Sequence, residues 1–91
     1  MLDLSRAFDP DRAEAHGWTP LHMSAFLRKQ QCIRELLDEG GAHVNPKTTR
    51  AWLRVPAGST PLDALRVTGA QDRPVLMELL SHGARPGEEL P

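Results

Sequence analysis

Two stretches of the sequence, GWTPLHMSA (residues 17–25) and STPLDAL (residues 59–65), each place a Thr-Pro pair before a short apolar run. Threonine is a favourable N-cap residue, because its hydroxyl accepts a hydrogen bond from an unpaired amide in the first turn of a helix. Proline suits the first helical position, where its missing N–H costs nothing and its φ angle is already helical. We therefore expect helices to begin after Thr19 and after Thr60.

A polar side chain follows each threonine by three residues, His22 in the first copy and Asp63 in the second. A carboxylate at this position can accept a hydrogen bond from the backbone of the capping residue. Its negative charge also suits the positive end of the helix dipole. Asp63 should therefore strengthen the start of its helix.

A second helix is expected after each of these starts, over residues 30–41 (QQCIRELLDEGG) and 72–84 (DRPVLMELLSHGA). Apolar residues recur at helical spacing in both, and glycines end both patterns. Asp72 can cap the later helix. The expected buried stripes are Ile33, Leu36 and Leu37 in the first helix, and Leu76, Leu79 and Leu80 in the second.

The order of these signals, G-x-T-P-L-H, a small apolar stretch and then LL-x-x-G-A, resembles the ankyrin repeat. Residues 17–45 match this pattern closely, apart from an extra glycine at Gly40-Gly41, Ser24 where the family usually has alanine, and Arg28 where it usually has glycine. Residues 58–86 match it less well, and Asp63 stands where the family usually has histidine. The resemblance implies an all-α solenoid of stacked helix–turn–helix units. It also implies that the imidazole of His22 pairs with a threonine hydroxyl and braces neighbouring turns.

The resemblance implies a single ankyrin-repeat domain over residues 1–91. Its expected parts are a partial repeat or cap (1–16), a repeat (17–45), an inserted finger (46–57), and a repeat with a C-terminal cap (58–91). The finger contains TTRAWLRV (48–55), whose strand-like composition favours a long loop or a β-hairpin.

So short an array should leave apolar surface uncovered at its two ends, because ankyrin arrays usually need about three repeats. The candidates for this surface are Leu2, Leu4 and Phe8 at one end, and Val75 and Met77 at the other.

Composition excludes several classes of function. The formal net charge is −1 and the pI is near 6.4, so bulk charge does not favour a nucleic-acid partner. The sequence has no apolar run long enough for a membrane span, so we expect no membrane association. Cys32 is the single cysteine, which fits a reducing compartment and a cytoplasmic protein.

We predict no catalytic residue, no cofactor and no metal site. The histidines His16, His22, His43 and His82 lack the paired spacing of a zinc site. His82 ends a helix, where a cation is favoured, and Cys32 should be a buried and inert small hydrophobe. The hypothesis of a small enzyme or metal protein would be favoured only if His16, His43 and a carboxylate lay close together in the structure.

The partner is expected to be another protein. A tryptophan at a repeat turn, such as Trp18, either packs on the neighbouring turn or anchors a contact, and Trp52 on the finger has the same two interpretations. Phe26 and Leu27 indicate either packing under the finger or a binding patch. Arg28 and Lys29, together with Lys47, Arg50 and Arg54, form either an ordinary charged surface or a basic patch for an acidic protein partner. The predicted contact residues are His16, Trp18, Phe26, Leu27, Arg28, Arg50, Trp52 and Arg54.

The sequence thus predicts a non-enzymatic protein–protein interaction module of the scaffold, adaptor or inhibitor/immunity type. It would act by displaying a preformed surface, which avoids part of the ordering cost of binding. The alternative is a self-associating structural domain that forms a homodimer through its uncovered repeat ends or its finger.

Overall fold

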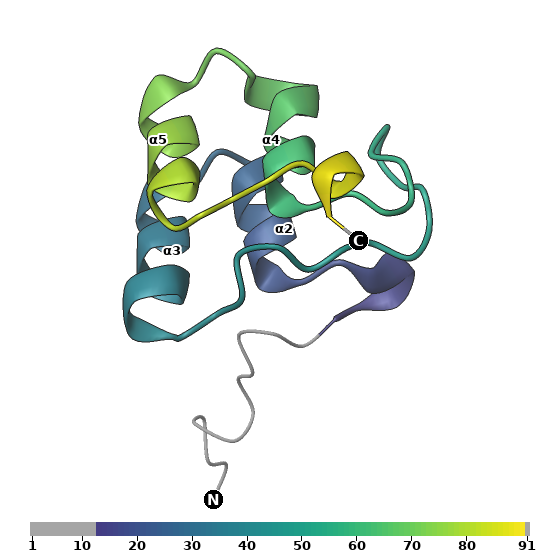
Figure 1. Ribbon diagram of the computed structural model, residues 1–91, viewed down its shortest axis with the longest axis horizontal. Helices are drawn as coiled ribbons and strands as arrows, with labels where there is room; N and C mark the ends of the chain where they lie inside the picture. Colours follow the sequence, from purple (N-terminus) through teal and green to yellow (C-terminus); the bar gives the residue numbers. More distant parts are fainter. Residues whose placement is uncertain (1–12, 91) are drawn as a thin grey trace, which may run out of the picture.

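The computed structural model describes residues 13–90, which form two stacked pairs of antiparallel helices (Figure 1). One layer contains α2 and α4, which lie side by side, and the other contains α3 and α5. The turns η1 and η3 flank the helices. The bounds are η1 Ala15–Gly17, α2 Pro20–Phe26, α3 Gln30–Arg34, η2 Glu35–Glu39, α4 Pro61–Gly69, α5 Arg73–Ser81 and η3 Gly87–Glu89. The apolar candidates Leu2, Leu4 and Phe8 lie outside the described residues.

Both predicted Thr-Pro helix starts are confirmed. Thr19 and Thr60 are the N-cap residues of α2 and α4, and proline occupies the first turn of each. The Asp63 carboxylate accepts a hydrogen bond from the Thr60 N–H at 3.0 Å, as its position predicts. Asp72 caps α5 by accepting from the Val75 N–H at 3.4 Å.

The helix that begins with α3 changes its winding before it ends, which the sequence pattern does not predict. Residues Glu35–Glu39 form a turn of π-helix, η2, and the Gly40 N–H donates to the Glu35 carbonyl at 2.8 Å. A π-turn accommodates one extra residue within a helix. It occurs here beside the additional glycine that departs from the repeat pattern. Gly41, with φ +67°, then reverses the chain.

The main core lies between the two helix layers. It comprises Leu21, Ala25, Ile33, Leu36, Leu62, Leu65, Val75, Leu79 and Ala84. Leu37 and Leu76 are partly buried against this core. Burial of this apolar surface is the principal favourable contribution to folding.

Three predictions about burial are wrong. On α5, Val75 is buried rather than exposed, whereas Leu80 is 44% exposed rather than part of the stripe. The buried face of α5 therefore passes through Val75 and Leu79, four residues apart. Cys32 is exposed rather than buried, because α3 turns Ile33 toward the core instead. Met77 is 62% exposed, as predicted.

Residues 46–57 form a long loop whose two ends are tied together. The Thr48 N–H donates to the Ser59 carbonyl, and the Gly58 N–H donates to the Thr48 carbonyl, both at 2.8 Å. This loop is the teal segment that curls beside α4 in Figure 1. It contains one antiparallel bridge, between Trp52 and Val55, and residues 13–90 contain no regular strand.

Leu53 and Arg54 form the two-residue turn between the bridged residues. Their φ angles are +52° and +67°. Positive φ at both central residues is the requirement of a type I′ turn, for which Asn-Gly is the preferred sequence. A side chain with a Cβ atom in this conformation costs roughly 1–2 kcal/mol.

We expect the double substitution Leu53→Asn with Arg54→Gly to raise the free energy of unfolding by about 1–2 kcal/mol, because it relieves this backbone strain. Urea denaturation would measure the change. Ala57→Gly is the matched control, since Ala57 is exposed in the same loop and has no positive φ. Equal effects of the control and the double substitution, or a loss of stability in the double variant, would contradict this account of the turn.

Candidate functional site

His22 joins the first helix pair to the turn that precedes the second. Its ring is fully buried, and Nε2 lies 2.9 Å from the Ser59 carbonyl oxygen. Its Nδ1 accepts from the Thr19 N–H at 3.2 Å and lies 3.0 Å from the Thr19 hydroxyl oxygen. Because a carbonyl only accepts and a backbone N–H only donates, the ring is neutral with its proton on Nε2. The structural role predicted for His22 is therefore confirmed.

Burial lowers the pKa of His22, because it penalises the charged imidazolium, and the Ser59 carbonyl offsets only part of that effect. Protonation of Nδ1 would also remove the acceptor that the Thr19 N–H uses. A histidine whose pKa is lower in the folded chain stabilises the fold above its unfolded pKa of about 6.5, and the stability is lost as the pH falls below that value.

We expect His22→Gln to reduce the free energy of unfolding at pH 7.5 by about 1–3 kcal/mol, because buried partners lose their hydrogen bonds. Denaturation at a series of pH values should show this difference shrinking between pH 7.5 and pH 5, since only the wild type then takes up a proton on unfolding. His43→Gln, at an exposed position, is the control. A wild-type advantage that grows as the pH falls would contradict the neutral ring.

Asp63 occupies the equivalent position in the second helix pair with the opposite hydrogen-bonding polarity. Its carboxylate accepts from the Gly87 N–H at 2.8 Å, whereas His22 donates to a carbonyl. The Thr60 hydroxyl adds a 2.7 Å hydrogen bond to the Arg85 carbonyl. The departure from histidine therefore keeps the link between successive turns and changes only which partner supplies the hydrogen.

Trp18 is the centre of a second, aromatic cluster. Its side chain is 2% exposed and packs with Val55 of the loop and Ala64 of α4. Its ring meets Phe26 edge-on, with centroids 5.5 Å apart, and meets Trp52 in the same way at 5.1 Å. Of the two interpretations of Trp18, the structure favours packing, and burial removes its side chain from direct contact with a partner. Phe26 is half-buried and likewise packs in this cluster.

The loop is also fixed to the first turn through His16. The His16 ring stacks on Trp52 with centroids 5.2 Å apart, and its carbonyl accepts from the Thr49 and Arg50 N–H groups at 2.8 and 3.2 Å. Gly17 allows this approach, because a Cβ atom there would lie 2.6 Å from the Thr49 nitrogen. His16 and Trp52 therefore hold the loop against the first helix pair.

The remaining predicted contact residues are exposed. Leu27 is 51% exposed and Trp52 is 39% exposed. Arg28, Arg50 and Arg54 are also exposed. Leu53 was not predicted as a contact residue, yet it is 41% exposed at the turn. The only feature of the sequence that could have indicated Leu53 as a contact residue is its position between Trp52 and Arg54.

The segment that contains the loop carries basic residues and no acidic residue of its own. Residues 40–62 contain Lys47, Arg50 and Arg54 and no acidic residue. Arg28 approaches from the turn between α2 and α3, where its side chain covers Gly69 closely enough that a Cβ atom there would lie 2.2 Å from its Cδ. We call Leu27, Arg28, Arg50, Trp52, Leu53 and Arg54 the loop-side set.

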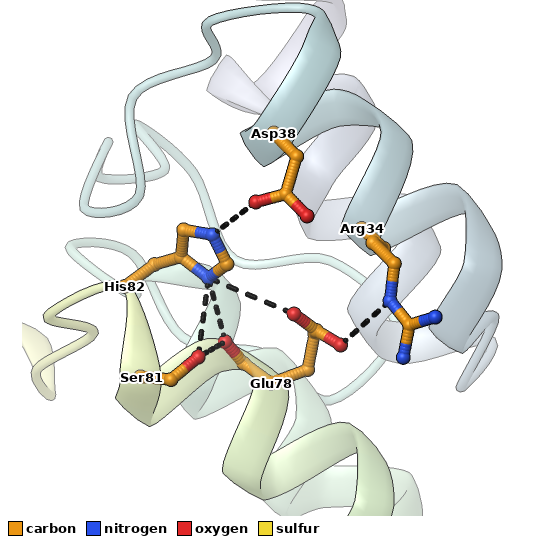
Figure 2. Close-up of polar contacts among 5 residues, drawn as sticks. All are labelled: Arg34, Asp38, Glu78, Ser81 and His82. Carbon is orange, nitrogen blue, oxygen red and sulfur yellow. Dashed lines mark hydrogen bonds and ion pairs between the residues drawn. The ribbon is translucent and has the colours of Figure 1, made fainter.

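A separate polar cluster links the outer helices (Figure 2). His82, the C-cap residue of α5, places Nε2 2.6 Å from Oδ1 of Asp38 in η2 and places Nδ1 2.9 Å from the Glu78 carbonyl oxygen. The Arg34 Nε donates to Glu78 Oε1 at 3.1 Å. The hydrogen bond to the Glu78 carbonyl, followed by the one to Asp38, raises the pKa of His82. The predicted place of His82 at a helix end is confirmed.

Asp38, Glu78 and His82 are the one group of three potential metal ligands that converges within residues 13–90. The set that would have favoured an enzyme or metal protein, His16 and His43 with a carboxylate, does not form such a group there. None of the helices in the described part of the chain has the length and apolar character needed to cross a membrane.

Comparison with known proteins agrees with the repeat geometry. The family model for the ankyrin repeat matches residues 16–49. The crystal structure of the human ASB11 ankyrin repeat domain superposes with a TM-score of 0.71 over 90% of this chain, at 24% sequence identity. This chain spans 33% of the length of that domain. Residues 16–49 therefore match an ankyrin repeat in sequence, and the described chain has the fold of an ankyrin repeat domain. Ankyrin repeats are generally modules for protein–protein interaction.

Proposed function

We propose that the chain is a non-enzymatic protein-binding module and that its partner contacts the loop-side set. The observation that carries the proposal is the exposure of Trp52 and Leu53 between Arg50 and Arg54 on the loop. Leu27 and Arg28 are exposed in the turn after α2. Exposed aromatic and arginine side chains are the types most often found at energetic centres of protein interfaces. The expected partner segment therefore combines acidic with apolar residues.

The buried aromatic cluster supports this proposal by explaining how the loop is held in place. The buried Trp18 ring contacts Trp52 edge-on, and the His16 ring of η1 stacks on Trp52. The backbone hydrogen bonds between His16 and the loop restrain it further. A loop that is already ordered loses less conformational entropy when it binds. Such a surface suits a scaffold, an adaptor or an inhibitor/immunity protein.

A random peptide display library would test the chemistry of the partner. Selection on the wild-type chain should enrich peptides that combine Asp or Glu with apolar residues. Their affinity should fall at least tenfold for the double variant Arg50→Glu with Arg54→Glu, because the charge complementarity is reversed. It should also fall as the salt concentration rises.

Met77→Ser is the matched control, because Met77 is exposed on α5, away from the loop. Circular dichroism would verify that each variant is folded. Enrichment of neutral or basic peptides, or affinities that the arginine reversal leaves unchanged, would contradict the proposed surface.

Self-association is a second candidate function, and exposed apolar side chains on α5 favour it. Met77 and Leu80 are exposed there. A hollow lined in part by Pro20, Cys32 and Leu36 lies on the first helix pair. A contact between these two unlike surfaces would be head-to-tail and would continue the stack of repeats.

Light scattering over a concentration series would test this second candidate. If the repeats stack on one another, the mass should rise with concentration, and Met77→Lys with Leu80→Lys should return the chain to a monomer. The same pair of changes should leave peptide binding at the loop intact. A constant monomer mass in the wild type would exclude self-association through these faces over the range tested.

A further inference from the structure

We propose that Asp38, Glu78 and His82 bind a divalent transition-metal ion, with zinc as the expected ion, and that this ion joins the outer helices of the two repeats. One ligand atom from each residue lies within 4.8 Å of the other two. Asp38 comes from η2, whereas Glu78 and His82 come from α5 and its C-cap (Figure 2). The proposal rests on this cluster alone and does not depend on the loop-side set.

The orientation of the His82 ring is the first argument. Nδ1 faces the Glu78 carbonyl oxygen at 2.9 Å, and a carbonyl only accepts, so Nδ1 carries a hydrogen. A metal-binding histidine commonly donates its second ring N–H in this way, which fixes the ring and directs the other nitrogen toward the ion. Nε2 is that other nitrogen, and it faces a carboxylate oxygen of Asp38.

The short approach of Nε2 to Asp38 is the second argument. The two atoms are 2.6 Å apart, so one ion between them could accept a lone pair from each. An ion bound tetrahedrally at about 2.1 Å from each ligand would separate them to about 3.4 Å. The exposed Asp38 side chain allows that small movement.

The charge of the cluster is the third argument. Two carboxylates face one guanidinium, that of Arg34, so only one of the two carboxylates is paired with an arginine. Arg34 contacts Oε1 of Glu78 and leaves Oε2 outside that contact. Because one potential ligand atom of Glu78 lies within 4.8 Å of those of Asp38 and His82, Glu78 can offer an oxygen to an ion while it keeps its ion pair with Arg34.

The mixture of donor atoms selects the class of metal. One imidazole nitrogen with two carboxylate oxygens suits zinc and related transition metals. Calcium prefers six to eight oxygen ligands, which this cluster does not provide. Because Asp38 is exposed, water can complete the coordination.

Isothermal titration of zinc chloride into the full chain at pH 8 would test the proposal. We expect one site in the wild type, with affinity reduced at least tenfold by His82→Ala and by Asp38→Asn. His43→Ala is the matched control, because it removes an exposed histidine outside the cluster and should leave the affinity unchanged. Calcium chloride should bind at least tenfold more weakly than zinc.

Thermal unfolding provides a second measurement. Each protein is compared with itself in the presence and absence of zinc, so a variant with a lower starting Tm can still be assessed. Zinc should raise the Tm of the wild type and of His43→Ala, since it binds the folded chain, and should leave that of His82→Ala unchanged. Absence of zinc binding in the wild type would overturn the proposal. An equal affinity or an equal rise in Tm in His82→Ala would overturn it as well.

Discussion

The carbonyl group of Ser59 is the point at which the parts of this molecule are joined. It accepts a hydrogen bond from Nε2 of the buried His22 and another from the Thr48 N–H. The first bond comes from the first helix pair and the second from the start of the long loop. Ser59 itself directly precedes Thr60, the N-cap residue of α4. One carbonyl therefore fixes the positions of both repeats and of the loop between them.

This constraint explains why buried polar groups occur at the turns of an otherwise apolar core. Removing His22 would leave the Thr19 N–H and the Ser59 carbonyl with fewer partners, and unsatisfied buried groups are costly. Asp63 shows that the same link can be made with an acceptor, because its partner in the next turn is the Gly87 N–H rather than a carbonyl. Both repeats therefore have a side-chain hydrogen bond to the next turn, although His22 donates it and Asp63 accepts it.

Local signals predicted the helices well, because the Thr-Pro starts, the Asp72 cap and the glycine ends act within a few residues of the chain. The resemblance to the ankyrin repeat then predicted how the helices stack. Sequence alone could not fix the rotation of α5, since both Val75 and Leu80 are apolar and only contact with α3 and α4 decides which is buried. The exposure of Cys32 depends on packing in the same way.

The sequence predicted the residue types of the candidate site, but it did not predict which of their side chains are buried. Exposed arginines and Trp52 follow from composition, but the burial of Trp18 requires the loop to fold back over the first helix pair. The turn at Leu53 and Arg54 carries no Asn or Gly signal, so its geometry was not foreseeable. Asp38 and His82 are 44 residues apart, and only the stacking of two repeats brings them together.

The contact between Trp18 and Trp52 gives the protein an internal optical reporter. The chain has two tryptophans and no tyrosine, so its near-ultraviolet emission comes essentially from this one pair of rings. Trp18 is shielded from water and Trp52 is partly open to it, while their rings remain in edge-on contact. Lifting of the loop would alter the emission of both rings, whereas a molecule resting on the outer surface would alter chiefly that of Trp52. Opening of the loop and occupation of its surface would therefore have different spectral signatures, without any attached dye.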